Sequence, residues 1–258
     1  MSLYVKALLF AFVLGAVIGS FLNVCIYRIP AGESIVSPAS RCPRCGQAIR
    51  WYQNIPILSF LLLRGKCGSC HVPISWRYPA IEALTGVLFA LVLDQYGVSV
   101  ATLAYWLFAA SLVTIMFIDL DHQIIPDVIS LPGILVGFCL SFFVPWVSWL
   151  GSLVGIVVGG GSLLLVAWGY ELLTGREGMG GGDIKFLAMI GAFLGWKAVL
   201  PVVFMSSLLG SLVGIPLMLI KGGRGGFALP FGPFLASAAL VWLLYADLVV
   251  ATYWRFLG

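Results

Sequence analysis

Charged residues are scarce in this chain: they make up 9% of its 258 residues, while hydrophobic residues make up 61%. A soluble domain carries about 25% charged residues, so too few are present to cover a water-exposed surface. Lysine and arginine do not form a basic stripe of the kind that binds nucleic acid, and we expect no nucleic-acid partner. These shortages exclude a soluble globular protein and indicate a protein of the lipid bilayer.

Long apolar runs take the place of the missing charge. A helix needs about 20 residues to cross a bilayer core, and backbone polar groups inside lipid must be satisfied within helices. The runs lack the alternation of outer-membrane strands. We predict an all-α polytopic membrane protein with about eight transmembrane helices, although 184–220 also fits one long broken hairpin. The apolar segments are 6–26, 79–96, 99–118, 128–145, 149–173, 184–196, 198–220 and 229–255.

Half of the 14 Lys and Arg residues lie in the segment 28–78. Positively charged loops remain on the cytosolic side, so we expect a multi-pass inner (plasma) membrane protein whose insert faces the cytosol. The domain organisation is then a first transmembrane helix (1–27), a cytosolic insert (28–78) and a helical bundle (79–258). Threading the later segments from this anchor places four more positive residues on the cytosolic side: Arg176, Lys185, Lys221 and Arg224.

Four of the six cysteines form two Cys-x-x-Cys pairs within the insert: Cys42, Cys45, Cys67 and Cys70. Two such pairs present four thiolates in the tetrahedral arrangement of structural zinc, and the cytosol disfavours disulfides. Zinc would also supply folding free energy to so small a region. A redox dithiol pair and four metal-free thiols are the alternatives. His71 adjoins the last cysteine, either as a replacement ligand or as an ordinary surface residue.

Acidic residues number only ten, and four of them follow apolar runs on the expected cytosolic side. Ionisable groups at membrane depth are costly and point to function. We expect Asp127, which follows Pro126, to cap the next helix, and Asp121 to be solvated. Asp119 and Asp183 lie closest to apolar segments and are the candidate functional pair.

Two adjacent carboxylates cannot both ionise cheaply, so one keeps a proton while the other is charged. Such a pair takes a proton from water and gives one to a carbonyl oxygen or leaving amine, which is peptide hydrolysis without a metal. The glycines at 180–182 before Asp183 would let a substrate backbone approach without a Cβ in the way. A phosphate-binding loop is the weaker alternative because no Gly-Lys-Ser/Thr sequence follows.

These residues resemble the bacterial type IV prepilin peptidases, members of the Gly-x-Gly-Asp class of intramembrane aspartyl proteases. The matching motifs extend along almost the whole chain and keep their order. They are 19–24 with Arg28 and Pro30, the two cysteine pairs, 51–56, 74–79 with Glu82, Asp119 with 125–127, 178–185 and 232–234.

The resemblance implies an aspartic endopeptidase that removes the basic leader of prepilins or pseudopilins in type IV pilus or type II secretion systems. Its catalytic positions correspond to Asp119 and Asp183. Many members also N-methylate the new amino terminus with S-adenosylmethionine, and the tetracysteine insert is associated with that bifunctional type. Glu82 is expected to fix the insert by pairing with Arg77 or Arg28, or else to receive the new terminus.

Three other functional classes of membrane protein make different predictions. A transporter or proton-coupled channel with an acidic relay would place acids near mid-membrane or show a symmetric repeat. A membrane scaffold whose zinc insert docks cytosolic partners would keep working after loss of Asp183. A membrane methyltransferase without protease activity would tolerate loss of either aspartate.

Overall fold

The computed structural model describes residues 2–175, 180–220 and 229–257, with side chains described as far as Thr252. Arg176, Gly178, Met179, Lys221 and Arg224, which the sequence analysis uses, lie outside the described residues.

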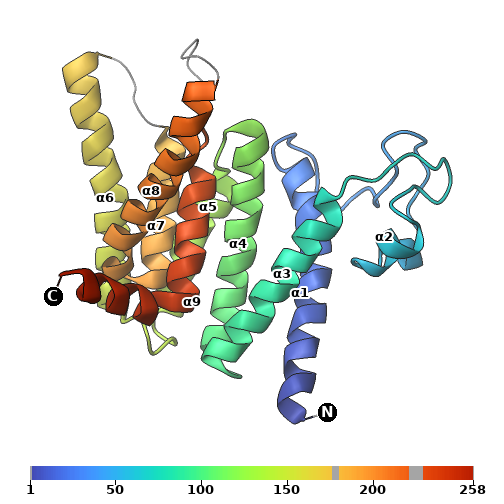
Figure 1. Cartoon of the computed structure of the whole chain (residues 1–258), viewed down its shortest axis with the longest axis horizontal. Helices are drawn as coiled ribbons and strands as arrows, with labels where there is room; N and C mark the ends of the chain where they lie inside the picture. Colours follow the sequence, from blue (N-terminus) through green and yellow to red (C-terminus); the bar gives the residue numbers. More distant parts are fainter. Residues whose placement is uncertain (1, 176–179, 221–228, 258) are drawn as a thin grey trace. The chain divides into compact units, whose positions relative to one another are not determined.

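Each of the eight apolar segments forms an α-helix (Figure 1). Within the described residues no strand forms, and the two isolated β-bridges both belong to the cysteine-rich insert. The insert also contains a 3-10 turn, η1 (Trp51–Asn54), and the short helix α2 (Leu58–Leu62). The eight helices are α1 (Leu3–Arg28), α3 (Arg77–Tyr96), α4 (Val100–His122), α5 (Asp127–Leu140), α6 (Trp149–Thr174), α7 (Gly181–Leu194), α8 (Trp196–Ile220) and α9 (Gly232–Leu257).

In the described ranges, six of these helices are long and apolar enough to cross a membrane. Helices α5 and α7 have 14 residues each. At 1.5 Å per residue they are about 21 Å long, which is shorter than a bilayer core of about 30 Å. The all-helical, multi-pass membrane architecture expected from the sequence is therefore confirmed, with two helices of less than spanning length.

Two helix boundaries differ from the expected segments. Helix α5 ends at Leu140 and not near residue 145, because a turn follows directly. The stretch 184–220 divides into α7 and α8 at a single residue, Gly195, whose φ of 77° favours glycine.

The chain divides into two compact units, an N-terminal unit (Met1–Thr114) and a C-terminal unit (Ile115–Gly258), with the boundary inside α4. In the N-terminal unit, α1 packs on α3 through small residues. A Cβ added to Gly15 would lie 2.6 Å from the Thr85 carbonyl oxygen, and one added to Gly19 would lie 2.8 Å from the Glu82 Cα. Only glycine permits so close an approach of two helix backbones.

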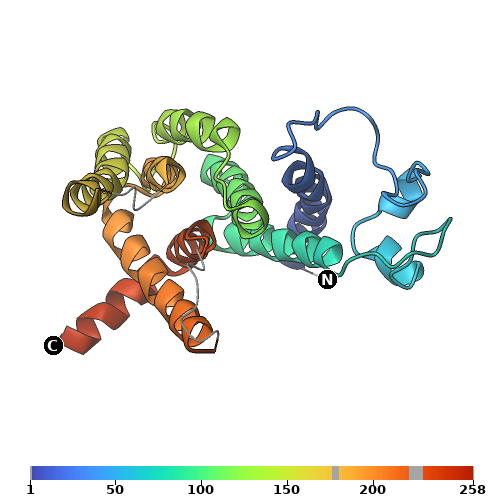
Figure 2. The ribbon, with the colours of Figure 1, turned by 90° about the horizontal axis from the view of Figure 1, so that it is seen from above.

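Helix α7 packs between α5 and α6 in the C-terminal unit (Figure 2). A Cβ on Gly155 would lie 2.3 Å from the Gly191 carbonyl oxygen, and one on Gly159 would lie 2.6 Å from that of Leu187. The Ser152 hydroxyl donates to the Ala192 carbonyl oxygen at 2.7 Å across the same helix pair. Small residues thus let α6 and α7 pack closely, which fixes α7, and this helix begins two residues before Asp183.

Candidate functional site

The four cysteines of the insert meet in one cluster. Their sulfur atoms all lie within 4.8 Å of one another, and the Sγ atoms of Cys42 and Cys70 are 3.8 Å apart. Four sulfurs bound at about 2.3 Å to one zinc ion stand about 3.8 Å apart in a tetrahedron. The residues therefore fit a four-coordinate metal site formed by Cys42, Cys45, Cys67 and Cys70.

The two cysteine pairs belong to two copies of the same backbone turn, which we call knuckle 1 (residues 40–51) and knuckle 2 (residues 65–76). In knuckle 1 the Cys42 N–H donates to the Gln47 carbonyl oxygen and the Gly46 N–H returns to Cys42. In knuckle 2 the Cys67 N–H donates to the Val72 carbonyl oxygen, and the His71 N–H donates to the Cys67 carbonyl oxygen. The bridges Arg41–Ala48 and Lys66–Pro73 repeat the correspondence.

The knuckle geometry lowers the pKa of the first thiol of each cysteine pair, whereas burial and neighbouring thiols raise the pKa of Cys70 to about 11. The backbone N–H of Cys45, followed by that of Arg44, lowers the pKa of the Cys42 thiol to about 6. The N–H of Cys70 lowers the pKa of Cys67 in the equivalent position. Since the thiolate is the metal ligand, these hydrogen bonds stabilise the form that binds.

His71 has a structural reason for its place in knuckle 2. Its φ of 57° corresponds to the φ of 70° at Gly46 in knuckle 1. The turn needs a residue in the left-handed region after each second cysteine, and histidine is among the non-glycine residues found there more often. The metal cluster consists of the four cysteines, so the structure supports the simpler reading of His71.

Asp119 lies near the end of α4 and is 5% exposed. Its Oδ2 accepts the backbone N–H of Gly232, the first residue of α9, at 2.9 Å. A Cβ on Gly232 would lie 2.6 Å from the same oxygen. The first turn of α9 therefore rests directly on the carboxylate, and a helix N-terminus carries a partial positive charge that attracts it.

Asp183 stands in the first turn of α7, and its carboxylate is close enough to that of Asp119 for their charges to interact. The two aspartates thus come from helix ends 64 positions apart in the sequence and lie within electrostatic range of each other in the C-terminal unit. A Cβ on Gly182 would lie 3.0 Å from the Ile125 side chain, whereas one on Gly180 or Gly181 would have no atom of the described residues within 4 Å.

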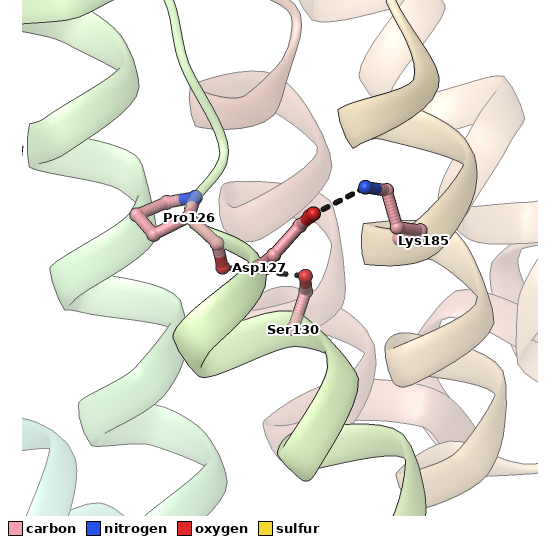
Figure 3. A network of polar contacts seen from close by, with 4 residues as sticks. All are labelled: Pro126, Asp127, Ser130 and Lys185. Atoms are coloured by element: carbon pink, nitrogen blue, oxygen red, sulfur yellow. Dashed lines mark hydrogen bonds and ion pairs between the residues drawn. The ribbon is translucent and has the colours of Figure 1, made fainter.

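Asp127 does not cap α5 as expected, because Pro126 occupies the cap position and makes no side-chain cap bond. Instead Asp127 Oδ1 pairs with the Lys185 ammonium of α7 at 2.5 Å, and the Ser130 hydroxyl donates to the Pro126 carbonyl oxygen at 3.3 Å (Figure 3). Lys185 is two positions beyond Asp183, so the two side chains leave α7 in different directions. This ion pair joins the first turns of α5 and α7. Asp121 is exposed, as expected.

Glu82 holds the insert as expected, and it does so by binding the backbone N–H of Ile57. It is 8% exposed, its Oε2 accepts the Ile57 N–H at 2.7 Å, and the Ser20 side chain of α1 lies beside its carboxylate. Arg28, one of its two expected partners, donates instead to the carbonyl oxygens of Ser34 and Pro38. A further role for Glu82 in receiving an amino terminus stays a prediction.

Comparison with known proteins places the chain among relatives along most of its length. Residues 13–96 match the bacterial peptidase A24 N-terminal domain, and residues 106–215 match the type IV leader peptidase family. The chain is 40% identical to a prepilin leader peptidase/N-methyltransferase of Pseudomonas putida, over 96% of this chain and 94% of the relative. It is 43% identical to a protein of the same name from Neisseria gonorrhoeae, over 91% of this chain and 88% of the relative.

The chain belongs to the type IV leader peptidase family. No solved structure matches it. The family resemblance inferred from the sequence motifs is confirmed. The A24 N-terminal match lies wholly inside the N-terminal unit with the cysteine cluster, while the leader peptidase match covers both aspartates.

One residue beside Asp119 had no role assigned to it from the sequence alone. Gly232 entered only as part of the motif 232–234, but it donates to Asp119 and leaves no room for a side chain. A Gly-Pro pair that opens an apolar helix was the available signal, since proline favours the first turn. The repeat of the two knuckles was a second signal: both copies have the form Cys-x-x-Cys-x-x-x-Ile-x-Trp, ending at Trp51 and Trp76.

Proposed function

We propose that this protein is a prepilin leader peptidase that cleaves the basic leader of type IV prepilins or pseudopilins and N-methylates the new amino terminus. The observation that supports the peptidase proposal is that Asp119 and Asp183, from two separate helix ends, lie within electrostatic range of each other. The shared name of the relatives supports both activities.

In the proposed reaction the two carboxylates act as an acid and a base. Neighbouring carboxylates share a proton because both cannot ionise cheaply. The charged one takes a proton from water, which attacks the scissile carbonyl carbon, and the protonated one gives its proton to the carbonyl oxygen. The tetrahedral intermediate then collapses as the leaving amine is protonated. The Gly232 N–H holds Asp119 in position for both steps.

The substrate's chemistry matches the location of the pair. We propose that the chain lies in the inner membrane with the insert and both aspartates on the cytosolic side. A basic leader stays cytosolic while its apolar helix enters the bilayer, so the scissile bond falls at the boundary. No atom of the described residues lies within 4 Å of a Cβ at Gly180 or Gly181, which supports the approach of a substrate backbone beside Asp183.

Two bound groups complete the proposal. Zinc, held by the four cysteines, would keep the insert folded and would have no open position for catalysis. S-adenosylmethionine would supply the methyl group to the newly exposed amine. A proton relay in a transporter is the alternative function, and no observation in the described residues favours it over peptide hydrolysis.

Cleavage of a purified prepilin by the full chain in detergent or nanodiscs tests the peptidase. Asp119→Asn and Asp183→Asn keep the shape of the side chain and remove the carboxylate. Because general acid–base catalysis contributes about 10²- to 10⁴-fold, each should lower the cleavage rate by at least about 100-fold. Asp121→Asn is the matched control and should cleave at the wild-type rate. Cleavage by a folded Asp119→Asn or Asp183→Asn variant at near wild-type rate would sink the two-carboxylate mechanism.

A further inference from the structure

A cavity of about 460 Å³ lies in the N-terminal unit, remote in sequence from the aspartates. Its walls are the C-terminal half of α1 and two stretches of the insert, 35–40 and 51–56. Small-molecule sites have volumes of about 300 to 1,000 Å³ and mostly apolar walls with a few polar groups. This cavity has that character, with Ser20, Arg28, Ser40 and Asn54 as the polar side chains of its wall.

Arg28 gives the cavity a positive charge, and the groups to which its guanidinium donates are uncharged. The side chain is 9% exposed, and its guanidinium donates to the carbonyl oxygens of Ser34 at 2.9 Å and Pro38 at 2.8 Å. Within the described part of the chain both partners are backbone carbonyls, which carry no net charge. A buried charge is ordinarily paired with an opposite one, and a guanidinium has five N–H donors. The site therefore suits an anionic group that a ligand would bring.

Trp51 supplies the opposite kind of surface. Its indole lines the cavity and is 82% exposed, so its face is available to an aromatic or cationic ligand. In knuckle 2 the equivalent Trp76 packs on Phe60, with ring centroids 4.7 Å apart. Both tryptophans are mostly exposed and each contacts one aromatic ring, Tyr52 for Trp51 and Phe60 for Trp76, but of the two only Trp51 lines the cavity.

The residue that directly follows the 51–56 wall, Ile57, is held in an unfavourable backbone conformation. Ile57 has φ 62°, which is rare for a β-branched residue, and its N–H is bound by the buried Glu82 carboxylate at 2.7 Å. The same carboxylate lies beside the Ser20 side chain of α1, which lines the cavity. Backbone strain held in place by surrounding contacts is a feature of ligand sites.

We propose that this cavity binds the methyl donor S-adenosylmethionine, with its carboxylate on the Arg28 guanidinium and its adenine against the Trp51 indole. The proposal rests on the methyltransferase half of the proposed function. A planar guanidinium suits a carboxylate because it donates two parallel hydrogen bonds, and the aromatic face suits the adenine. Arg28 and Trp51 are then binding residues, and Glu82 is a positioning residue for the cavity wall.

Direct binding tests the site without relying on turnover. The full zinc-loaded chain in nanodiscs of zwitterionic lipid is titrated with S-adenosylmethionine and, separately, S-adenosylhomocysteine by calorimetry. Arg28→Gln should weaken binding about 10-fold or more, since hydrogen bonds to charged groups contribute that much, and Trp51→Leu should weaken it several-fold. Arg64→Gln and Trp76→Leu are the matched controls outside the cavity and should bind like wild type. Zinc content and circular dichroism report whether each variant folds.

Arg28 also binds the backbone carbonyl oxygens of Ser34 and Pro38, so Arg28→Gln could unfold the insert. In that case Trp51→Leu still tests the site. Unchanged donor affinity in the folded variants overturns the proposal, as does a wild type that cleaves prepilin but binds no donor. Loss of a co-purified anionic lipid from Arg28→Gln without loss of donor binding also overturns it, because the cavity is then a lipid site. If the wild type binds the donor and Arg28→Gln and Trp51→Leu bind it more weakly, the site is supported even where prepilin is not cleaved. The binding assay therefore distinguishes failure of this proposal from failure of the peptidase proposal.

Discussion

The cysteine cluster and the aspartate pair are built in opposite ways. Cys42 and Cys70 are 28 positions apart, and each sits in a short backbone turn that the chain forms twice. Asp119 and its hydrogen-bond partner Gly232 are 113 positions apart and meet only because the end of α4 and the start of α9 come together. The first site is set by local turn chemistry, and the second by helix packing within the C-terminal unit.

Glycine has a different role at each site. In knuckle 1 Gly46 provides a positive φ, and a Cβ there would meet no other atom. Near the aspartates Gly232 and Gly182 provide space, because a Cβ would lie 2.6 Å from Asp119 and 3.0 Å from Ile125. Substitutions at the cluster should therefore act through backbone conformation, and those at the aspartates through overlap.

Removing the metal should have the largest effect and should be confined to one region. Structural zinc contributes about 10–16 kcal/mol of binding free energy in zinc-finger peptides, more than the insert can replace from its own small core. Cys42→Ser, or a strong chelator, should release the zinc and unfold both knuckles. Hydrogen–deuterium exchange should then rise across residues 41–73 while α6 and α7 stay protected. Cys139→Ser, outside the cluster, is the control, and a fully protected, zinc-loaded Cys42→Ser variant would contradict the prediction.

Gly232→Ala should damage the aspartate site and spare the cluster. The added Cβ overlaps the Asp119 carboxylate, and overpacking costs about 1–3 kcal/mol. Prepilin cleavage should fall strongly as Asp119 is displaced, while zinc content and donor binding stay unchanged. Gly161→Ala in α6 is the matched control, because an added Cβ there has no described atom within 4 Å and Gly161 has no part in the proposed site. Equal cleavage by the two variants would show that contact with α9 does not position Asp119.

Sequence reasoning predicted local features better than distant ones. Apolar length indicated all eight helices, and the spacing of the cysteines indicated one cluster, because both depend on neighbouring residues. The scarcity of acidic residues was enough to single out Asp119 and Asp183 as the candidate pair. Their proximity, however, depends on how α4 and α7 pack, and no local pattern shows that.

The errors have the same cause. Asp127 was expected to act within its own helix, but its partner is Lys185 on α7. Arg28 was one of two expected partners of Glu82, the other being Arg77, but its side chain donates to the carbonyl oxygens of Ser34 and Pro38. In both cases a charged side chain had several partners within reach, and tertiary packing chose among them.

The left-handed position of the knuckles offers a smaller test, which compares the two copies. A residue other than glycine in this region costs about 1–2 kcal/mol, so Gly46→Ala should weaken zinc retention and His71→Gly should strengthen it slightly. Competition with a chelator should show shifts of about tenfold and a few-fold, in opposite directions. If His71→Gly releases the zinc, His71 is a ligand and the equivalence of the two knuckles fails.

The ion pair between Asp127 and Lys185 should have the smallest effect of all, although it lies beside Asp183. Their side chains are 54% and 35% exposed, and exposed ion pairs contribute only about 0–1 kcal/mol. A double-mutant cycle of Asp127→Asn and Lys185→Gln, followed by thermal unfolding, should give a coupling free energy below about 1 kcal/mol that shrinks with salt. Lys197→Gln, an exposed lysine of α8, is the control for loss of positive charge. A salt-independent coupling well above that range would mean that lipid or substrate shields the pair, and that charge as well as close helix packing holds the first turn of α7 in place.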